Sequence, residues 1–290
     1  MAAPFVSSAS PPDCPGVEAP TWAGLSLDRP RIMGVLNVTP DSFSDGGEYT
    51  DPQTAIAAGL AMVAAGADVI DVGGESTRPR SQPTSPDVEQ ARILPVIRGL
   101  ASAGVRVSVD TRHAATMAAA LDAGASIVND VSALAFDPAS AALVAVRGCP
   151  VVLMHMRGDP ADMYAHAKYD DVVQDVRCEL VERIAAAERA GVAHEQIAID
   201  PGIGFAKKPA QSMELLRRLP ELASLGYPIL VGVSRKSFMA SVTGEVDPRR
   251  RLPGSLAAGL FALSRGAAIL RVHDVAETVQ AIRVWRALAP

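Results

Sequence analysis

The feature that most constrains the fold is a regular alternation of short apolar runs with longer Ala-rich segments. The longer segments carry apolar residues at three- and four-residue spacing, which is the period of an amphipathic helix. Helices are expected at Pro52–Ala65, Pro86–Ala103, His113–Ala123, Asp170–Ala190 and Pro253–Arg265. Eight apolar runs are predicted as strands: Ile32–Leu36, Asp68–Val72, Arg106–Val109, Ser126–Val128, Val151–Met154, Gln196–Ile199, Pro228–Val231 and Ala267–Leu270.

Strict alternation of apolar strands and helices predicts an α/β protein with a parallel sheet covered by helices. Eight such units favour a single-domain (β/α)₈ TIM barrel over an open doubly wound sheet, and no GxGxxG motif follows the first strand. Residues 31–290 are close to the length of about 250 residues that is typical of this barrel. Residues 1–30 are rich in Pro, Ala and Ser, and we expect a flexible N-terminal tail there, without the features of a signal peptide.

Composition argues against several classes of protein. The formal net charge is −5, whereas proteins that bind the phosphates of nucleic acids usually carry excess Lys and Arg. No apolar run is long enough to cross a membrane. Three cysteines without a CxxC spacing predict neither a disulfide framework nor a zinc site, and they fit a reducing cytoplasm. We therefore expect a cytoplasmic protein that binds neither nucleic acid nor membrane.

Polar side chains follow every predicted strand. A single Asp at such a position is more often a helix cap, but capping does not easily explain eight polar ends together. In a TIM barrel these ends meet at one rim, where the active site forms. The ends carry Asn37, Glu75, Asp110, Asn129, His155, Asp200, Lys236 and Arg271 with His273.

The residue types at this rim suggest two halves of a substrate. Carboxylates, an amide and an ammonium suit a planar, nitrogen-rich heterocycle, and they come from Asp110, Asn129, Asp200 and Lys236. A second group supplies donors suited to phosphate oxygens, and it consists of Ser76, Thr77, Arg78, Arg271 and His273.

Lys236 could alternatively form a Schiff base. The histidines lack zinc-ligand spacing, whereas Mg²⁺ leaves little trace in a sequence, and Asn37 could offer it an oxygen.

Seven segments in fixed order resemble the motifs of the dihydropteroate synthase family, whose members are pterin-binding (β/α)₈ barrels. The resemblance covers Ile32 to about Arg283. The matching segments are Met33–Gly47, Asp71–Pro79, Ser108–Thr111, Asn129–Ser132, Asp200–Phe205, Gly232–Phe238 and Arg271–Val275.

The resemblance implies a transferase of folate biosynthesis. It would join 4-aminobenzoate to 6-hydroxymethyl-7,8-dihydropterin diphosphate and release pyrophosphate, with Mg²⁺ as cofactor. Family members are usually homodimers, and sulfonamides compete for the aminobenzoate position.

The resemblance also implies roles for single residues. The pterin would be held by Asp110, Asn129, Met154, Asp200 and Lys236. Asn37 would help to bind Mg²⁺, while Arg271 and His273 would bind the diphosphate. The aminobenzoate would lie near Thr77, Arg78, Phe205, Ser234 and Lys236. The expected catalytic residues are Asp110, Lys236, Arg271 and His273.

The segment after Phe205 departs from the family pattern. The family commonly has Gly-Lys-Thr and then an Asn, whereas this chain has Ala206-Lys207-Lys208 and then Ser212. Alanine is tolerated at position 206 if the backbone φ is negative, and is strained if φ is positive. Two alternatives remain: a catalytically inactive pterin-binding paralogue, and a folate-dependent methyltransferase barrel with a corrinoid partner. The loop motifs of the first two segments argue against both.

Overall fold

The structure is a computed structural model that describes residues 20–39, 51–76 and 84–288. Eight parallel strands form one sheet in the order β8-β7-β6-β5-β4-β3-β10-β9, and a parallel bridge between Ile199 and Ile229 joins its two edges. The strands are β3 (Arg31–Asn37), β4 (Val69–Gly73), β5 (Val107–Asp110), β6 (Ile127–Asp130), β7 (Val151–Met154), β8 (Ile197–Asp200), β9 (Leu230–Val231) and β10 (Ile269–Val272). The predicted (β/α)₈ TIM barrel and all eight of its strands are therefore confirmed.

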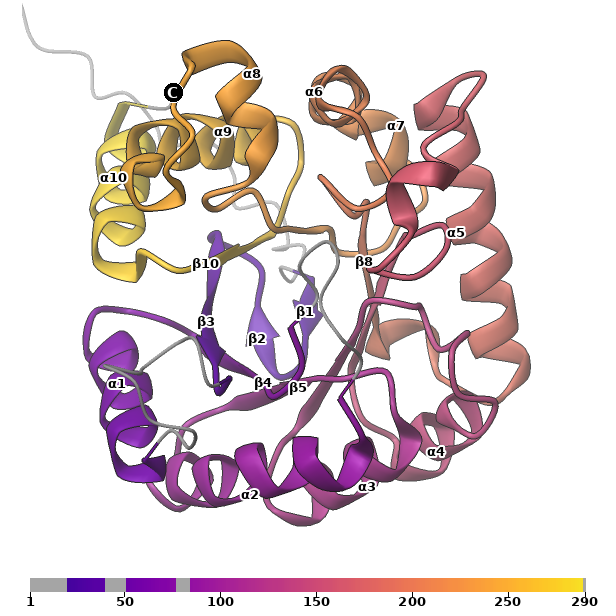
Figure 1. Cartoon of the computed structure of the whole chain (residues 1–290), viewed down its shortest axis with the longest axis vertical. Helices are drawn as coiled ribbons and strands as arrows, with labels where there is room; N and C mark the ends of the chain where they lie inside the picture. Colours follow the sequence, from indigo (N-terminus) through magenta and orange to yellow (C-terminus); the bar gives the residue numbers. More distant parts are fainter. Residues whose placement is uncertain (1–19, 40–50, 77–83, 289–290) are drawn as a thin grey trace, which may run out of the picture.

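Helices surround the barrel (Figure 1). They are α1 (Pro52–Ala64), α2 (Pro86–Ser102), α3 (Ala114–Asp122), α4 (Ser140–Arg147), α5 (Val172–Arg189), α6 (Pro209–Arg217), α7 (Leu219–Ala223), α8 (Ala240–Thr243), α9 (Leu252–Ser264) and α10 (Val275–Leu288). Short 3₁₀ helices are η1 (Met163–His166), η2 (His194–Gln196), η3 (Ser237–Met239) and η4 (Pro248–Arg250). Within the described ranges, no helix combines the length and the apolar character that crossing a bilayer requires.

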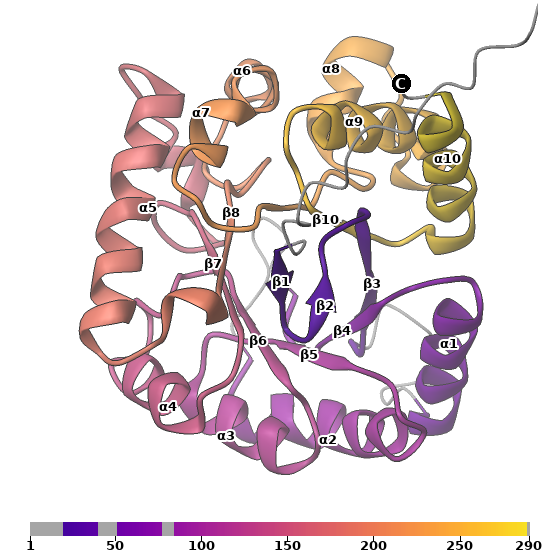
Figure 2. The same ribbon diagram turned by 180° about the vertical axis from the view of Figure 1, so that it is seen from behind.

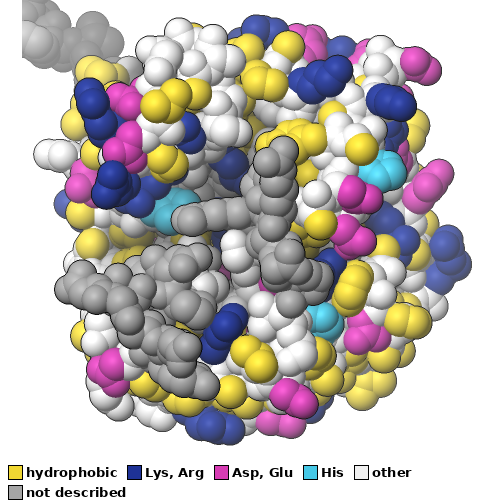
Figure 3. Space-filling view, viewed as in Figure 1, with side chains coloured by type: hydrophobic (Ala, Val, Ile, Leu, Met, Phe, Trp, Pro, Cys, Tyr) yellow, Lys and Arg dark blue, Asp and Glu magenta, His cyan; other side chains and the backbone are white. Residues whose placement is uncertain are grey.

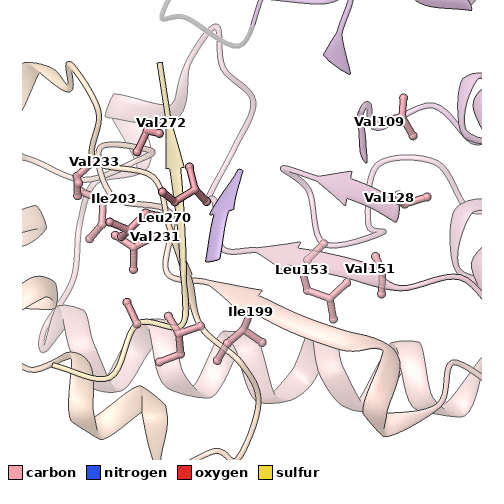
Figure 4. Packing of buried hydrophobic residues seen from close by; sticks show 14 of the residues in the cluster. Val109, Val128, Val151, Leu153, Ile199, Ile203, Val231, Val233, Leu270 and Val272 are labelled. Carbon is pink, nitrogen blue, oxygen red and sulfur yellow. The ribbon is translucent and has the colours of Figure 1, made fainter. Parts of the chain in front are cut away.

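Alternate residues of each strand face opposite sides, and this divides the core in two. Outward-facing residues such as Val109, Val128 and Leu153 belong to the large cluster between strands and helices (Figure 4). Inward-facing residues form a smaller cluster inside the barrel, which includes Met33 and Val69. Because both faces of a parallel strand are buried, the strands read as continuous apolar runs.

A β-hairpin made of β1 (Thr21–Trp22) and β2 (Leu25–Ser26) joins the cluster inside the barrel. The Trp22 side chain is 1% exposed, and its Nε1 donates a hydrogen bond of 2.9 Å to the carbonyl oxygen of Gln196. Figure 2 shows the hairpin at the end of the barrel opposite to the strands' carboxyl ends. The predicted tail was therefore too long: residues 20–30 belong to the fold, and residues 1–19 lie outside the described residues.

Candidate active site

Alternate residues of the strands face the barrel interior, and they place a layer of polar side chains above the apolar cluster inside the barrel. Val69 of β4 and Ile269 of β10 belong to the cluster inside the barrel. Asp71 and Arg271, two residues further along, therefore also face the interior. The same step of two leads from Ile127 to Asn129 on β6 and from Ala198 to Asp200 on β8, so charged and amide groups converge on the barrel axis.

A pocket opens at this layer, on the side of the strands' carboxyl ends. Acidic and basic side chains are interspersed over the described part of the face seen in Figure 3. The pocket is lined by Val35, Asp110, Asn129, Val131, Met154, Asp200, Ile203, Phe205, Gly232, Ser234, Lys236, Arg271 and His273. Nine of these were predicted as site residues. Asn37 ends β3 outside this lining, and Thr77 and Arg78 lie outside the described residues.

Arg271 connects two acidic side chains at the base of the pocket. Its Nε donates to Oδ2 of Asp71 at 2.6 Å, and its Nη2 donates to Oδ2 of Asp110 at 2.6 Å. Asn129 Nδ2 also donates to Asp71 Oδ2, at 2.9 Å. Burial lowers the pKa of Arg271, but the attraction of Asp71 and Asp110 outweighs burial and raises it. Arg271, which belongs to the predicted phosphate half of the site, is thus a cation held in contact with Asp110 of the predicted heterocycle half.

The two carboxyl groups of the pocket ionise less readily than usual. Burial raises the pKa of Asp110 to about 7, against the opposing effect of Arg271, and the negative charge of Asp71 adds to the rise. Burial also raises the pKa of Asp200, while a backbone hydrogen bond from Gly202 and the charge of Lys236 oppose that rise. Groups that titrate near neutral pH in a pocket are typical of functional sites.

Lys236 follows β9 and His273 follows β10, and these two strands are neighbours in the barrel. The Lys236 Nζ lies 3.9 Å from the centre of the Phe205 ring, a cation–π contact. Burial lowers the pKa of Lys236 to about 8, although Asp200 opposes this. His273 Nδ1 lies 3.0 Å from Ser234 Oγ, and burial followed by the charge of Arg271 lowers the His273 pKa to about 4. Lys236 is therefore cationic at neutral pH, while His273 is neutral.

The loop between β8 and α6 turns sharply beside Asp200. Gly202 donates its N–H to Asp200 Oδ1 at 2.7 Å and has a φ of +66°. Ala206 has a φ of +49°, so the condition for a tolerated alanine is not met there. A left-handed conformation costs a non-glycine residue about 1–2 kcal/mol. The chain thus retains a strained residue next to the pocket.

We expect Gly202→Ala to harm the protein more than a matched substitution elsewhere. A Cβ at Gly202 would lie 1.9 Å from the carbonyl oxygen of His155, a backbone atom, whereas a Cβ at Gly104, with φ +77°, meets nothing within 4 Å. Gly104→Ala should cost about 1–2 kcal/mol from its φ alone. Gly202→Ala should cost more in urea denaturation and lower kcat/KM about tenfold by displacing Asp200. Equal effects of the two variants would contradict this account.

Sequence reasoning missed two residues of this region. Asp71 is fully buried within β4, two residues before the end of that strand, whereas the predicted site residues were sought at the strand ends. The sequence feature that could have revealed it is a charged residue within an otherwise apolar strand, two positions after Val69. Lys207 belongs to the loop after β8, where its side chain is buried (2% exposed), whereas its neighbour Lys208 is exposed.

A separate acidic cluster lies outside the pocket lining. Among the described residues, Glu75, Glu89 and His113 place possible metal-ligand atoms within 4.8 Å of one another. However, Arg112 donates to Glu75 at 3.3 Å, and Thr111 donates to Oε2 of Glu89 at 2.9 Å. Protein donors therefore already contact both carboxylates, although Oε1 of Glu89 has no hydrogen-bond partner among the described residues.

Known proteins resemble this chain over most of its length. The pterin binding enzyme family model matches residues 33–273. The dihydropteroate synthase of Neisseria meningitidis serogroup C is 46% identical over 267 residues, which cover 91% of this chain and 94% of that protein. A probable bifunctional folylpolyglutamate synthase/dihydropteroate synthase of Haloferax volcanii is 51% identical over 257 residues. This match covers 89% of the chain but only 30% of that longer protein.

Solved structures agree. The Xanthomonas albilineans dihydropteroate synthase with 4-aminobenzoic acid is 49% identical, with a TM-score of 0.87 over 92% of this chain and 97% of that one. The same enzyme in complex with 7,8-dihydropteroate aligns with a TM-score of 0.83 and 47% identity over 92% and 97% of the two chains. The chain therefore belongs to the pterin binding enzyme family and, within it, to the dihydropteroate synthases, which are transferases of folate biosynthesis.

Proposed function

We propose that the pocket binds 6-hydroxymethyl-7,8-dihydropterin diphosphate and that the chain transfers its pterinylmethyl group to 4-aminobenzoate. The observation that carries this proposal is the layer of Asp110, Asn129 and Asp200 on the apolar floor of the barrel, with Lys236 beside it. Such a layer offers acceptors and donors in one plane, as a pterin ring requires. The structures of a relative with 4-aminobenzoic acid and with 7,8-dihydropteroate support the choice of substrates.

Pterin binding is assigned to the residues at the base of the pocket. Asp110, Asn129 and Asp200 hydrogen-bond the edge of the ring, and Met154 packs on its face. A carboxyl group with a pKa about 7, such as Asp110, carries negative charge in part of the molecules at neutral pH. As a carboxylate, it stabilises the positive charge that develops at the methylene when the diphosphate leaves.

The reaction itself needs no covalent bond to the protein. The C–O bond between the methylene and the diphosphate breaks, the aminobenzoate nitrogen forms the new C–N bond, and that nitrogen loses a proton. Arg271 and His273 stabilise the charge on the departing pyrophosphate. Phe205, Ser234 and Lys236 border the aminobenzoate, and Thr77 and Arg78 are proposed to lie near it as well.

Asn37 is the residue proposed to hold Mg²⁺. Alternation along β3 from Met33, which lies in the cluster inside the barrel, directs Asn37 toward the interior. A single amide oxygen fits Mg²⁺, which usually keeps several waters and binds substrate phosphates. The ion would neutralise negative charge on the diphosphate as it leaves.

We further propose a homodimer that works in the cytoplasm. Neighbouring helices expose apolar side chains at Val242 on α8, Phe261 on α9 and Val284 on α10. Light scattering at micromolar concentration tests the dimer, and a mass of 30.2 kDa would contradict it.

Pyrophosphate release tests the proposed function directly. We expect the purified chain to release pyrophosphate only when both substrates are present, and to lose activity when EDTA removes divalent metal. Adding Mg²⁺ back in excess should restore the rate, and the strained Ala206 should not prevent turnover. Tight binding of the pterin diphosphate without turnover would instead favour the inactive paralogue. Transfer of a methyl group from a folate would favour the methyltransferase.

A further inference from the structure

We propose that Lys207 is a positioning residue that holds Phe205, and through it Lys236, at the aminobenzoate side of the pocket. The inference rests on the proposed function, because it assigns a task within that site. Lys207 is part of the loop between β8 and α6, its side chain is buried under that loop, and it does not line the pocket.

The Lys207 side chain joins this loop to the end of β7. Its Nζ lies 2.9 Å from the carbonyl oxygen of Phe205 and 2.9 Å from Nδ1 of His155. The carbonyl oxygen of His155 lies at 3.4 Å. Three acceptors therefore surround one ammonium, which can donate three hydrogen bonds. The backbone of Phe205 is tied to β7 by this contact.

A hydrogen-bonded chain leads from Lys207 toward the surface. An ammonium only donates, so His155 Nδ1 must accept and the proton of the neutral ring must sit on Nε2. Nε2 lies 3.0 Å from Oε2 of Glu179 on α5, which Arg157 also contacts through its Nε at 2.9 Å from Oε1. Burial and the charge of Lys207 lower the His155 pKa to about 4, which agrees with a neutral ring.

The cost of burial argues against a passive role for Lys207. A buried charge costs several kcal/mol in desolvation, whereas an apolar side chain of similar length would fill the space without that cost. Burial lowers the Lys207 pKa to about 7, while Asp200 and Glu179 oppose the shift, so the ammonium is populated at and below neutral pH. The left-handed turn at Ala206 precedes the buried Lys207, while Lys208 lies exposed.

Phe205 connects Lys207 with the pocket. Its carbonyl oxygen accepts a hydrogen bond from Lys207, and the Nζ of Lys236 lies 3.9 Å from the centre of its ring. Loss of the Lys207 ammonium should let the Phe205 backbone and ring shift, and Lys236 with them. Asp110 and Asn129 belong to β5 and β6, away from this loop, so most of the pterin contacts should remain.

The test compares Lys207→Met with Lys208→Met, which removes the same charge from the exposed neighbour. At pH 6.5 we expect Lys207→Met to raise the KM for aminobenzoate about fivefold, as loss of a hydrogen bond of about 1 kcal/mol implies. The Kd for the pterin diphosphate should rise by a smaller factor than the aminobenzoate KM, because Asp110 and Asn129 keep their places, and Lys208→Met should match the wild type. Equal losses for both substrates, or no change in either, would overturn the inference.

Two further measurements keep the inference testable if Lys207→Met does not fold. Glu179→Ala removes the acceptor of His155 and should raise the aminobenzoate KM, whereas Glu179→Gln keeps an acceptor and should restore it. Nitrogen-15 NMR of the histidines should show the Nε2–H tautomer of His155 in the wild type. Failure of rescue, or the other tautomer, counts against the proposal. A wild-type chain without synthase activity would contradict the proposed function instead.

Discussion

Arg271→Met is expected to lower turnover about a thousandfold, which is the upper range for losing one electrostatic donor at a reacting centre. The same change should destabilise the fold by about 3–5 kcal/mol, because it leaves the buried Asp71 and Asp110 without their shared cation. Stopped assays of pyrophosphate release and urea denaturation measure the two effects. Arg265→Met, which removes an exposed arginine directly after the end of α9, is the matched control and should change neither.

Two comparisons separate the roles of Arg271. Adding Asp71→Asn to Arg271→Met removes one of the unpaired carboxylates, so it should restore part of the stability but not the activity. Calorimetry should show that Arg271→Met weakens the pterin diphosphate much more than free 6-hydroxymethyl-7,8-dihydropterin. If both ligands weaken equally, Arg271 supports Asp110 and does not bind the diphosphate.

The barrel could be predicted because its strands are buried on both faces. Runs such as Val151–Met154 are continuous in the sequence, and the structure begins and ends this strand at the predicted residues. The hairpin escaped prediction because each of its strands has two residues, and only a few side chains, among them Trp22 and Leu25, pack it into the barrel. Strands of two residues are too short to show a periodic pattern.

The site residues at the ends of the strands could be predicted from the sequence, whereas those within a strand or buried under a loop were missed. Asp110, Asn129 and Asp200 end their strands and line the pocket. Asp71 sits within its strand, and its partner Arg271 is 200 positions away, so no local pattern links them. Two adjacent lysines look alike in a sequence, and the backbone turn at Ala206 decides that Lys207 is the buried one.

Lys236→Met should lower kcat/KM for the pterin diphosphate about a hundredfold, because a charged hydrogen bond contributes about 1.5–3 kcal/mol. Pterin affinity and turnover should fall together. Lys236→Arg keeps the charge and should recover part of the loss. A Schiff base at Lys236 would instead be trapped by borohydride in the presence of a carbonyl substrate, and such an adduct would contradict the assigned role.

The pH dependence of kcat/KM for the pterin diphosphate reports ionisations of the free enzyme, and it should show those of both Asp110 and Lys236. The proposed active form has Asp110 as a carboxylate and Lys236 as an ammonium. With Asp110 at a pKa about 7 and Lys236 at a pKa about 8, the value should rise as pH increases through 7 and fall above 8. Lys236→Met should abolish the alkaline fall and leave the acid limb, while Asp110→Asn should do the reverse. An alkaline fall that persists without Lys236 would assign it to another group, and Lys236 would then act by its position alone.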